Sequence, residues 1–393
     1  MTLRLSNAEY QRHREALFAK AAPHNLDAFV TFIPNNVVYF SSFGFISTER
    51  PIAFIFNEKT SVLLVPRLEE EHAQEVSLAE KIVAYPEYPG LRHPLEFLKD
   101  ILVDLGVDKG RIGVDGDGYG RIFGYRGPSV SQLVPEATVV NVLDEIEYLQ
   151  SINSPEELEL IRESAKWGNL AHAYLQEYSK VGVSELEISL RASTDATLAQ
   201  IRALGPDFRP RGDGARAAFR GQVGKASANP HALANNAKLK PGDILGTFGG
   251  SSIWGYGSEL ERTLIVGEPS AEQEKFFGLL VEVQDLALNA IRPGIPTSAV
   301  DDAVNAFFKE HDLEQYWRHH TGHAKSTLIH EAPFLDSGDQ TPIEVGQVFT
   351  VEPGIYVPDL GGFRHSDTVV VTEDGIDFIT YYPRDLESLI VPV

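Results

Sequence analysis

Residues 229–263 read NPHALANNAKLKPGDILGTFGGSSIWGYGSELERT, and the rest of the chain is interpreted around them. His231 follows a proline, an apolar strand comes next, and a turn is predicted at 249–250. The chain then returns with two carboxylates, Glu259 and Glu261. A base and acids on rigid backbone are what general acid–base catalysis requires, so this stretch predicts the centre of an active site.

Length and composition narrow the class of protein. A chain of 393 residues is long enough for about two domains. It contains no cysteine, which excludes disulfides, thiolate nucleophiles and Cys-ligated metals. Its net charge of −22 argues against nucleic acid or an anionic membrane as a partner. Without a long apolar run or the apolar core of a signal peptide, we expect no membrane span and a cytoplasmic location.

The pattern of elements predicts two domains. Strands and helices alternate over residues 26–115, with a turn at 35–36 and a hairpin over 50–65, which indicates an α/β first domain over residues 1–150. The sequence SPEE at 154–157 is typical of a helix start and opens a second domain over residues 151–393. For this domain we predict helices and strands that together form an α+β arrangement. The helices span 155–177, 184–204, 271–290 and 299–310, and the strands span 244–247, 262–266, 348–351 and 368–372.

Three further motifs follow in the second domain. They are HHTGH at 319–323 with His330 shortly after, GQVFTVEPG at 346–354 with Glu352 at a strand end, and GGFRHSD at 361–367. Each alone has a structural explanation as a glycine turn, a solvated histidine or a strand-end acid. Four such motifs in one domain favour a functional site.

With these motifs the chain resembles the superfamily of creatinase, prolidase, aminopeptidase P and methionine aminopeptidase. The resemblance covers the whole chain and implies a creatinase-type α/β domain over residues 1–150 and a pita-bread catalytic domain over 151–393. In the metallopeptidases of this superfamily, two Asp, one His and two Glu hold a pair of divalent ions, which activate water and polarise the scissile carbonyl.

Several of these ligand positions differ in this chain. Phe248 stands in place of the first aspartate, Glu259 in place of the second, and Ser366 in place of the last glutamate, while His323 and Glu352 match. Because a phenylalanine cannot bind a metal, too few donors are left for two ions. We therefore predict no catalytic metal and no cofactor.

Creatinase, a member that works without metal, gives the tighter match through His231, GDIL at 242–245 and LERT at 260–263. The resemblance implies that His231 relays a proton while Glu261 and Glu352 hold a cationic substrate and the imidazolium that forms. The favoured prediction is a metal-independent hydrolase that cleaves a C–N bond of a small guanidino, amidine or amide compound.

The same resemblance implies further contacts. Arg50 matches an arginine that reaches the neighbouring subunit's site, so a homodimer is predicted. His323, His330, Tyr256 and Phe248 are predicted to face the small-molecule substrate. Arg364 and Asp367 are expected to form a structural pair that braces the last ligand strand.

Two alternatives stay open. One is an Xaa-Pro dipeptidase with an atypical or single metal on Glu259, His323 and Glu352, and the other is a non-catalytic binding protein with the same fold. The arginines of segment 209–220 either line an entrance for a carboxylate-bearing substrate or pair with acids in a solvated loop.

Overall fold

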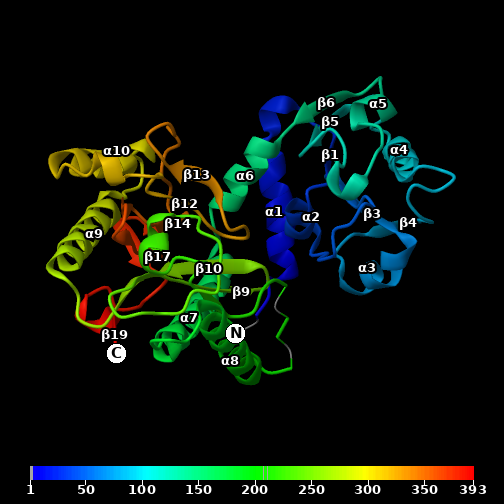
Figure 1. Cartoon of the computed structure of the whole chain (residues 1–393). Coiled ribbons are helices and arrows are strands. Elements are labelled where there is room, and N and C mark those ends of the chain that lie inside the picture. The colour runs from blue at the N-terminus through cyan, green and yellow to red at the C-terminus, as the bar shows by residue number, and fades with distance from the viewer. Residues whose placement is uncertain (1–2, 207, 210) are drawn as a thin grey trace. The chain divides into compact units, whose positions relative to one another are not determined.

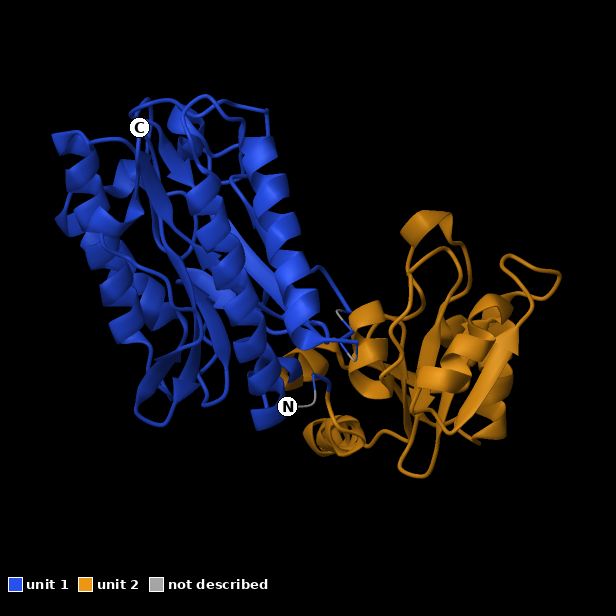
Figure 2. Ribbon diagram, turned by 90° about the horizontal axis from the view of Figure 1, so that it is seen from below, with its two compact units in different colours: residues 1–4, 150–393 blue, residues 5–149 orange. Residues whose placement is uncertain are grey.

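The computed structural model describes residues 3–206, 208–209 and 211–393. The chain divides into two compact units, Leu5–Leu149 and Gln150–Val393, with Leu3 and Arg4 belonging to the second (Figure 2). Each unit has its own hydrophobic core. None of the helices in the described part of the chain has the length and apolar character that crossing a membrane requires.

The first unit is built on a mixed sheet with the strand order β4-β3-β2-β1-β5-β6 (Figure 1). Its strands are β1 (Ala28–Thr31), β2 (Ala53–Phe56), β3 (Ser61–Pro66), β4 (Lys81–Tyr85), β5 (Arg111–Val114) and β6 (Thr138–Asn141). Its helices are α1 (Asn7–Lys20), α2 (Pro34–Ser41), α3 (Glu70–Val76), α4 (Pro94–Asp104), α5 (Val130–Leu133) and α6 (Leu143–Ser151). Strands β1, β5 and β6 are parallel, whereas β2 is antiparallel to both β1 and β3, so the predicted α/β domain and its hairpin are confirmed.

Successive residues of the central strands supply different cores. Val30 on β1 packs in a cluster with Leu98 of α4, while Phe29 packs in a cluster with Leu17 of α1. This follows from the two-residue period of a strand, which needs apolar cover on both faces here. The predicted turn at 35–36 is wrong, because Pro34 occupies the first position of α2, where its missing N–H costs nothing.

The second unit contains a long antiparallel sheet with the order β13-β12-β14-β17-β10-β9-β7, and β18 also pairs with β17 (Figure 1). Smaller sheets join β19-β11-β8 and β15-β16. The strands are β7 (Arg216–Ala218), β8 (Ile244–Gly246), β9 (Phe248–Ile253), β10 (Tyr256–Glu261), β11 (Thr263–Val266), β12 (Gly322–Ala324), β13 (Glu331–Leu335), β14 (Val348–Val351), β15 (Gly354–Val357), β16 (Gly361–Arg364), β17 (Ser366–Thr372), β18 (Gly375–Phe378) and β19 (Ile390–Val391). The helices are α7 (Pro155–Tyr178), α8 (Glu185–Leu204), α9 (Ala271–Ala290) and α10 (Ser298–Glu310).

The predicted long helices of this unit are confirmed to within a residue or so at each end. Local signals explain the agreement, since Ser154 and Ser270 each form a capping box at the start of α7 and α9. Helices α7 and α8 pack against β7, β9 and β10, and α9 and α10 lie beside β14 and β13 (Figure 1). Helices beside an antiparallel sheet give the expected α+β arrangement.

The turn predicted at 249–250 is wrong, because both glycines lie inside β9. A Cβ on Gly249 would come within 2.9 Å of the Gly168 carbonyl oxygen, so these glycines let α7 approach the strand closely. The hairpin instead turns at Trp254 and Gly255, both with positive φ, which two-residue hairpin turns of the I′ type require.

Candidate active site

The register of the long sheet gathers acidic and imidazole side chains on one face. Glu259 and Glu261 are two residues apart on β10 and therefore point to the same face. His323 on β12 is paired with Thr350 on β14, and Glu352 follows Thr350 by two residues. Since β17 joins β14 to β10, the sheet brings these four groups together from distant parts of the chain.

Glu259, His323 and Glu352 form a buried triad whose ligand atoms all lie within 4.8 Å of one another. The Nδ1 atom of His323 lies 3.0 Å from the Ala324 carbonyl oxygen, which can only accept, so we place the ring hydrogen on Nδ1. Nε2 then faces Oε1 of Glu352 at 3.4 Å. Two acceptors at this separation require a proton or another cation between them.

The pKa values of the triad reflect this demand for positive charge. Burial and the nearby carboxylates of Glu352 and Glu261 raise the pKa of Glu259 to about 7. Burial alone would raise the pKa of Glu352, but its contact with His323 and the charge of Arg364 lower it well below its usual range. Burial alone would lower the pKa of His323, yet the Glu352 carboxylate outweighs it and raises that pKa. Positive charge is therefore favoured at the triad, either as a shared proton or as a metal ion.

The donor set of the triad fits one divalent cation. Carboxylates and imidazole are suitable ligands for such ions, and the charges of two carboxylates balance the charge of one divalent ion. The buried Nε2 of His323 also has no hydrogen-bond partner within the described ranges. A second ion does not fit, because Ser366 is paired with Glu261 across β17 and β10, and Phe248 continues that row on β9. The site thus lacks the donors for two ions but has those for a single ion.

Two arginines already neutralise Glu261. Nη2 of Arg364 donates to Oε1 of Glu261 at 2.9 Å, Nε of Arg364 donates to the other carboxylate oxygen, and Arg220 forms an ion pair with Oε1. Nη1 of Arg364 donates to the Tyr356 hydroxyl at 2.9 Å, and Nε2 of His319 lies 2.7 Å from the same hydroxyl. The carboxylate predicted to hold a cationic substrate is therefore occupied by guanidinium groups of the protein itself.

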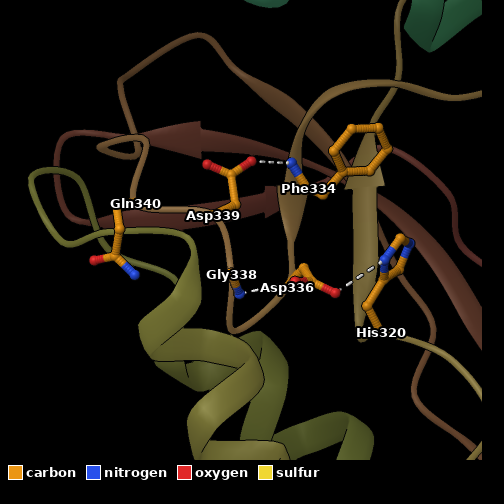
Figure 3. A pocket seen from close by; sticks show the side chains of 6 residues that line it. All are labelled: His320, Phe334, Asp336, Gly338, Asp339 and Gln340. Atoms are coloured by element: carbon orange, nitrogen blue, oxygen red, sulfur yellow. Dashed lines mark hydrogen bonds and ion pairs between the residues drawn. The ribbon is translucent and has the colours of Figure 1, made fainter.

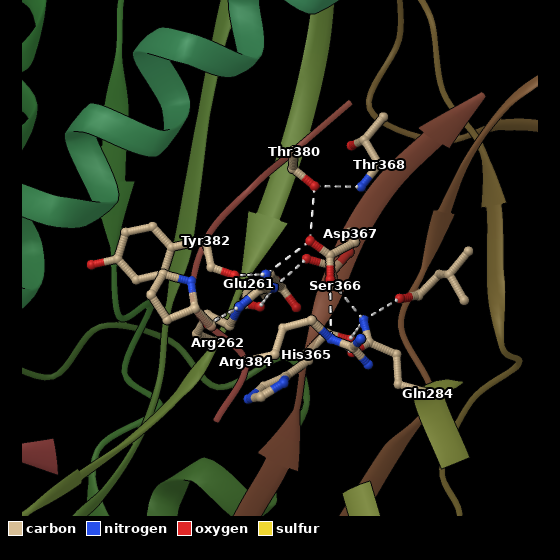
Figure 4. A network of polar contacts seen from close by, with 12 residues as sticks. Glu261, Arg262, Gln284, His365, Ser366, Asp367, Thr368, Thr380, Tyr382 and Arg384 are labelled. Carbon is tan, nitrogen blue, oxygen red and sulfur yellow. Dashed lines mark hydrogen bonds and ion pairs between the residues drawn. The ribbon is translucent and has the colours of Figure 1, made fainter. Parts of the chain in front are cut away.

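A second ion pair behind the site fixes β10 against β17 (Figure 4). Arg262 is fully buried, and its Nη2 donates to Oδ1 of Asp367 at 2.9 Å. The Arg262 guanidinium also donates to the main-chain oxygens of Glu261, Ser366, Tyr382 and Pro383. The predicted pairing of Arg364 with Asp367 is wrong, since Asp367 pairs with Arg262 and Arg364 pairs with Glu261.

Other predicted site residues lie outside the triad. His231 is exposed, and in the described part of the chain its side chain has no hydrogen bond or ion pair. Tyr256 lies on the opposite face of β10, where its hydroxyl donates to Glu157 of α7 at 2.8 Å, which corrects its placement next to substrate. His330 is exposed and stacks on His323 with ring centroids 4.0 Å apart, so it covers the triad.

Arg50 lies in the first unit. Its guanidinium is held by Glu87 and by Glu49, each with a nitrogen–oxygen distance of 2.7 Å. Its predicted role at a neighbouring subunit's site stays a prediction.

A hollow lies beside His320 of the HHTGH motif (Figure 3). His320, Phe334, Asp336, Gly338, Asp339 and Gln340 line it. Nδ1 of His320 is 3.5 Å from Oδ2 of Asp336, and Asp339 accepts from the main-chain N–H of Phe334 at 2.8 Å. The Gln340 amide donates to the Ser298 hydroxyl at 3.0 Å, and none of the triad residues lines the hollow.

Sequence reasoning missed two contributors to the site. Lys325 is buried near the triad, where its charge acts on Glu259, and its Nζ donates to the Leu328 carbonyl oxygen at 3.2 Å. It comes two residues after His323, so strand periodicity could have indicated it. Tyr356 had no such local signal, because only the pairing of β15 with β16 brings it to Arg364.

The fold and the site together define a class. A creatinase-type α/β unit followed by a pita-bread unit with an acidic and imidazole centre is the architecture of a two-domain hydrolase. Residues 13–152 match the creatinase/prolidase N-terminal domain, and residues 159–373 match metallopeptidase family M24. The chain belongs to metallopeptidase family M24, and it is a hydrolase of carbon–nitrogen bonds.

Named relatives agree with this assignment. The chain is 30% identical to the uncharacterized peptidase YqhT of Bacillus subtilis over 66% of its own length and 70% of that protein. It is 28% identical to the Xaa-Pro dipeptidase of Pyrococcus furiosus, covering 90% and 93% of the two chains. The solved structure of an Xaa-Pro dipeptidase from Bacillus anthracis superimposes with a TM-score of 0.81 at 25% identity, covering 97% and 99%. These relatives favour the dipeptidase alternative over a metal-independent amidinohydrolase.

Proposed function

We propose that this protein is a dipeptidase that hydrolyses Xaa-Pro or similar dipeptides at a site with one divalent cation. The observation that carries the proposal is the buried triad of Glu259, His323 and Glu352, with ligand atoms within 4.8 Å of one another. The peptidase relatives support the same reaction class. The occupied carboxylate of Glu261 counts against a guanidinium substrate.

In this proposal Glu259, His323 and Glu352 would hold the ion. When bound, a divalent ion polarises the scissile carbonyl and makes a coordinated water more acidic. The Ala324 carbonyl fixes the ring of His323, so that Nε2 faces the centre. Burial excludes bulk water from the triad, which strengthens every charge interaction there. His330, stacked on His323 and exposed, can hydrogen-bond a bound dipeptide from the open side.

Metal content and turnover measured on the full chain test the proposal. Protein purified without chelator should contain about one equivalent of a divalent metal, and it should cleave alanyl-proline in a chelator-sensitive manner. His323→Gln should lose both the metal and the activity, while the matched variant His320→Gln, outside the triad, should keep both. Chelator-insensitive turnover by metal-free protein, or hydrolysis of creatine rather than a dipeptide, would refute the proposal.

A further inference from the structure

The arginines of the segment before the site differ in their contacts, and Arg211 stacks on Trp254 with its guanidinium carbon 3.5 Å from the ring centroid. Arg209 donates to the carbonyl oxygens of Pro206 and Phe208, and Arg216 lies 3.9 Å from Asp213 with its side chain 58% exposed. These contacts belong to a solvated loop. Arg220 differs, because it forms an ion pair with the buried Glu261 beside the triad.

The surroundings of Arg220 leave part of its guanidinium accessible. The guanidinium carbon lies 5.3 Å from the centroid of the Phe248 ring, and the side chain is 36% exposed. A guanidinium has five N–H donors, and within the described ranges one nitrogen of Arg220 is engaged, by Glu261. With 36% of its side chain exposed, Arg220 can offer further donors to a ligand that lies beside the Phe248 ring.

The position of Phe248 follows from the sheet register. Leu260 pairs with Gly249, so the next pair along the ladder sets Phe248 opposite Glu261, on the face that carries Glu259. A Cβ on Gly250 would lie 3.0 Å from Cζ of Phe248, so the ring covers that glycine. Phe248 thus supplies an apolar wall next to the triad.

Glu261 is paired with two guanidinium groups, those of Arg220 and Arg364, while the carboxylates of Glu259 and Glu352 lie close by. Arg364 is buried, and its donors are used by Glu261 and Tyr356. Of the two arginines, Arg220 is therefore the one whose guanidinium can reach a ligand. In a chain with a net charge of −22, a partly exposed guanidinium beside the reaction centre is suited to binding an anionic group.

We propose that Arg220 binds the free carboxylate of the substrate, with Phe248 packing against the residue that carries it. The substrate class is then a short peptide with an unblocked C-terminus, and Glu261 acts as the positioning residue that holds Arg220. Arginine is suited to this role because its planar fork matches a carboxylate in two hydrogen bonds. This inference rests on the proposed dipeptidase function.

The test compares an acid with its amide on the metal-supplemented full chain. The wild type should prefer alanyl-proline to alanyl-prolinamide by roughly 10- to 100-fold in kcat/KM, which corresponds to one charge-assisted hydrogen-bonded pair. Arg220→Met should lose this preference through a higher KM for the acid, with the amide little changed. Arg220→Lys should be intermediate, and Arg216→Met, from the same loop, should match the wild type. An equal loss of kcat/KM for the acid and the amide in Arg220→Met would overturn the inference. Kinetics of Arg220→Met that equal those of the wild type would do so as well.

A binding measurement separates this inference from the proposed function. L-proline should raise the melting temperature of the wild type more than L-prolinamide does, and Arg220→Met should abolish the difference. If the wild type cleaves no dipeptide, the proposed function is wrong, yet the proline comparison still decides whether Arg220 binds a carboxylate. Equal protection by proline and prolinamide in the wild type would refute carboxylate recognition even if dipeptides are cleaved.

Discussion

Replacing Arg262 with methionine tests the idea that a buried ion pair fixes the strands that carry the site. Arg262 has no exposed surface, and its guanidinium bonds Asp367 together with four main-chain carbonyl oxygens. Methionine keeps much of the side-chain volume but removes every donor. Asp367 keeps hydrogen bonds from Thr380 at 2.9 Å and Gln284 at 3.1 Å, and Arg384 lies 3.8 Å away.

The loss of unfolding free energy expected for Arg262→Met follows from these contacts. Removing one partner of a buried ion pair costs about 3–5 kcal/mol, because the other charge is left buried without its partner. The partners that Asp367 retains place the expected loss near the lower end, at about 3 kcal/mol in the free energy of unfolding. Arg384→Met is the matched control, since that side chain is 24% exposed and its ion pairs should contribute about 1 kcal/mol or less.

Urea unfolding followed by tryptophan fluorescence suits this measurement. All three tryptophans, at positions 167, 254 and 317, lie in the unit Gln150–Val393, so the signal reports on the unit that contains Arg262. The double variant Arg262→Met with Asp367→Asn should lose less than the sum of the single variants, because neither charge is then stranded. A loss below about 1 kcal/mol for Arg262→Met, or additive losses in the double variant, would refute this reasoning.

Three further predictions concern other contacts of the second unit. Burial and the charge of Arg262 lower the pKa of His172 from 6.5 to about 3. The contribution of neutral His172 to the free energy of unfolding is therefore fully present above about pH 6.5, and it falls by up to about 1.4 kcal/mol per pH unit on acidification. His172→Gln cannot titrate, and acid unfolding curves should show a shallower decline than the wild type; parallel curves would contradict this. Tyr256→Phe loses the bond to Glu157 and should cost about 1 kcal/mol in urea unfolding with KM unchanged, whereas a raised KM would return Tyr256 to the substrate side. Glu185→Ala removes the acceptor of three main-chain N–H groups of the segment 221–236, and limited proteolysis there should become faster; unchanged cleavage would show that the segment is held by other contacts.

Local signals predicted the elements of this protein well, and they predicted pairings poorly. The helix starts at Ser154 and Ser270 are encoded within four residues, so sequence alone placed α7 and α9 correctly. The glycines at 249–250 were misread as a turn, because the reason for them is a helix that lies eighty residues earlier in the chain. A close approach between distant segments leaves no local pattern that distinguishes it from a turn.

In the candidate site, too, the sequence predicted residue types but not which side chains pair. The family motifs named Glu259, His323 and Glu352 as ligands only in the dipeptidase alternative, whereas the favoured prediction was a site without metal. They could not indicate that Glu261 is neutralised by Arg220 and Arg364, because those partners come from separate strands whose register only the folded sheet fixes.

The sequence by itself determined the superfamily, the two-domain organisation of an acidic, cysteine-free chain, and the residue types available for catalysis. It did so because capping, periodicity and motif spacing are written in short stretches of chain. Only the tertiary structure decided which charges meet. Cross-strand register brought a triad together on one face of the sheet, turned Tyr256 to the other face and set an arginine beside Phe248. The physical reason is that an electrostatic interaction depends on distance and burial, and both are properties of the folded chain.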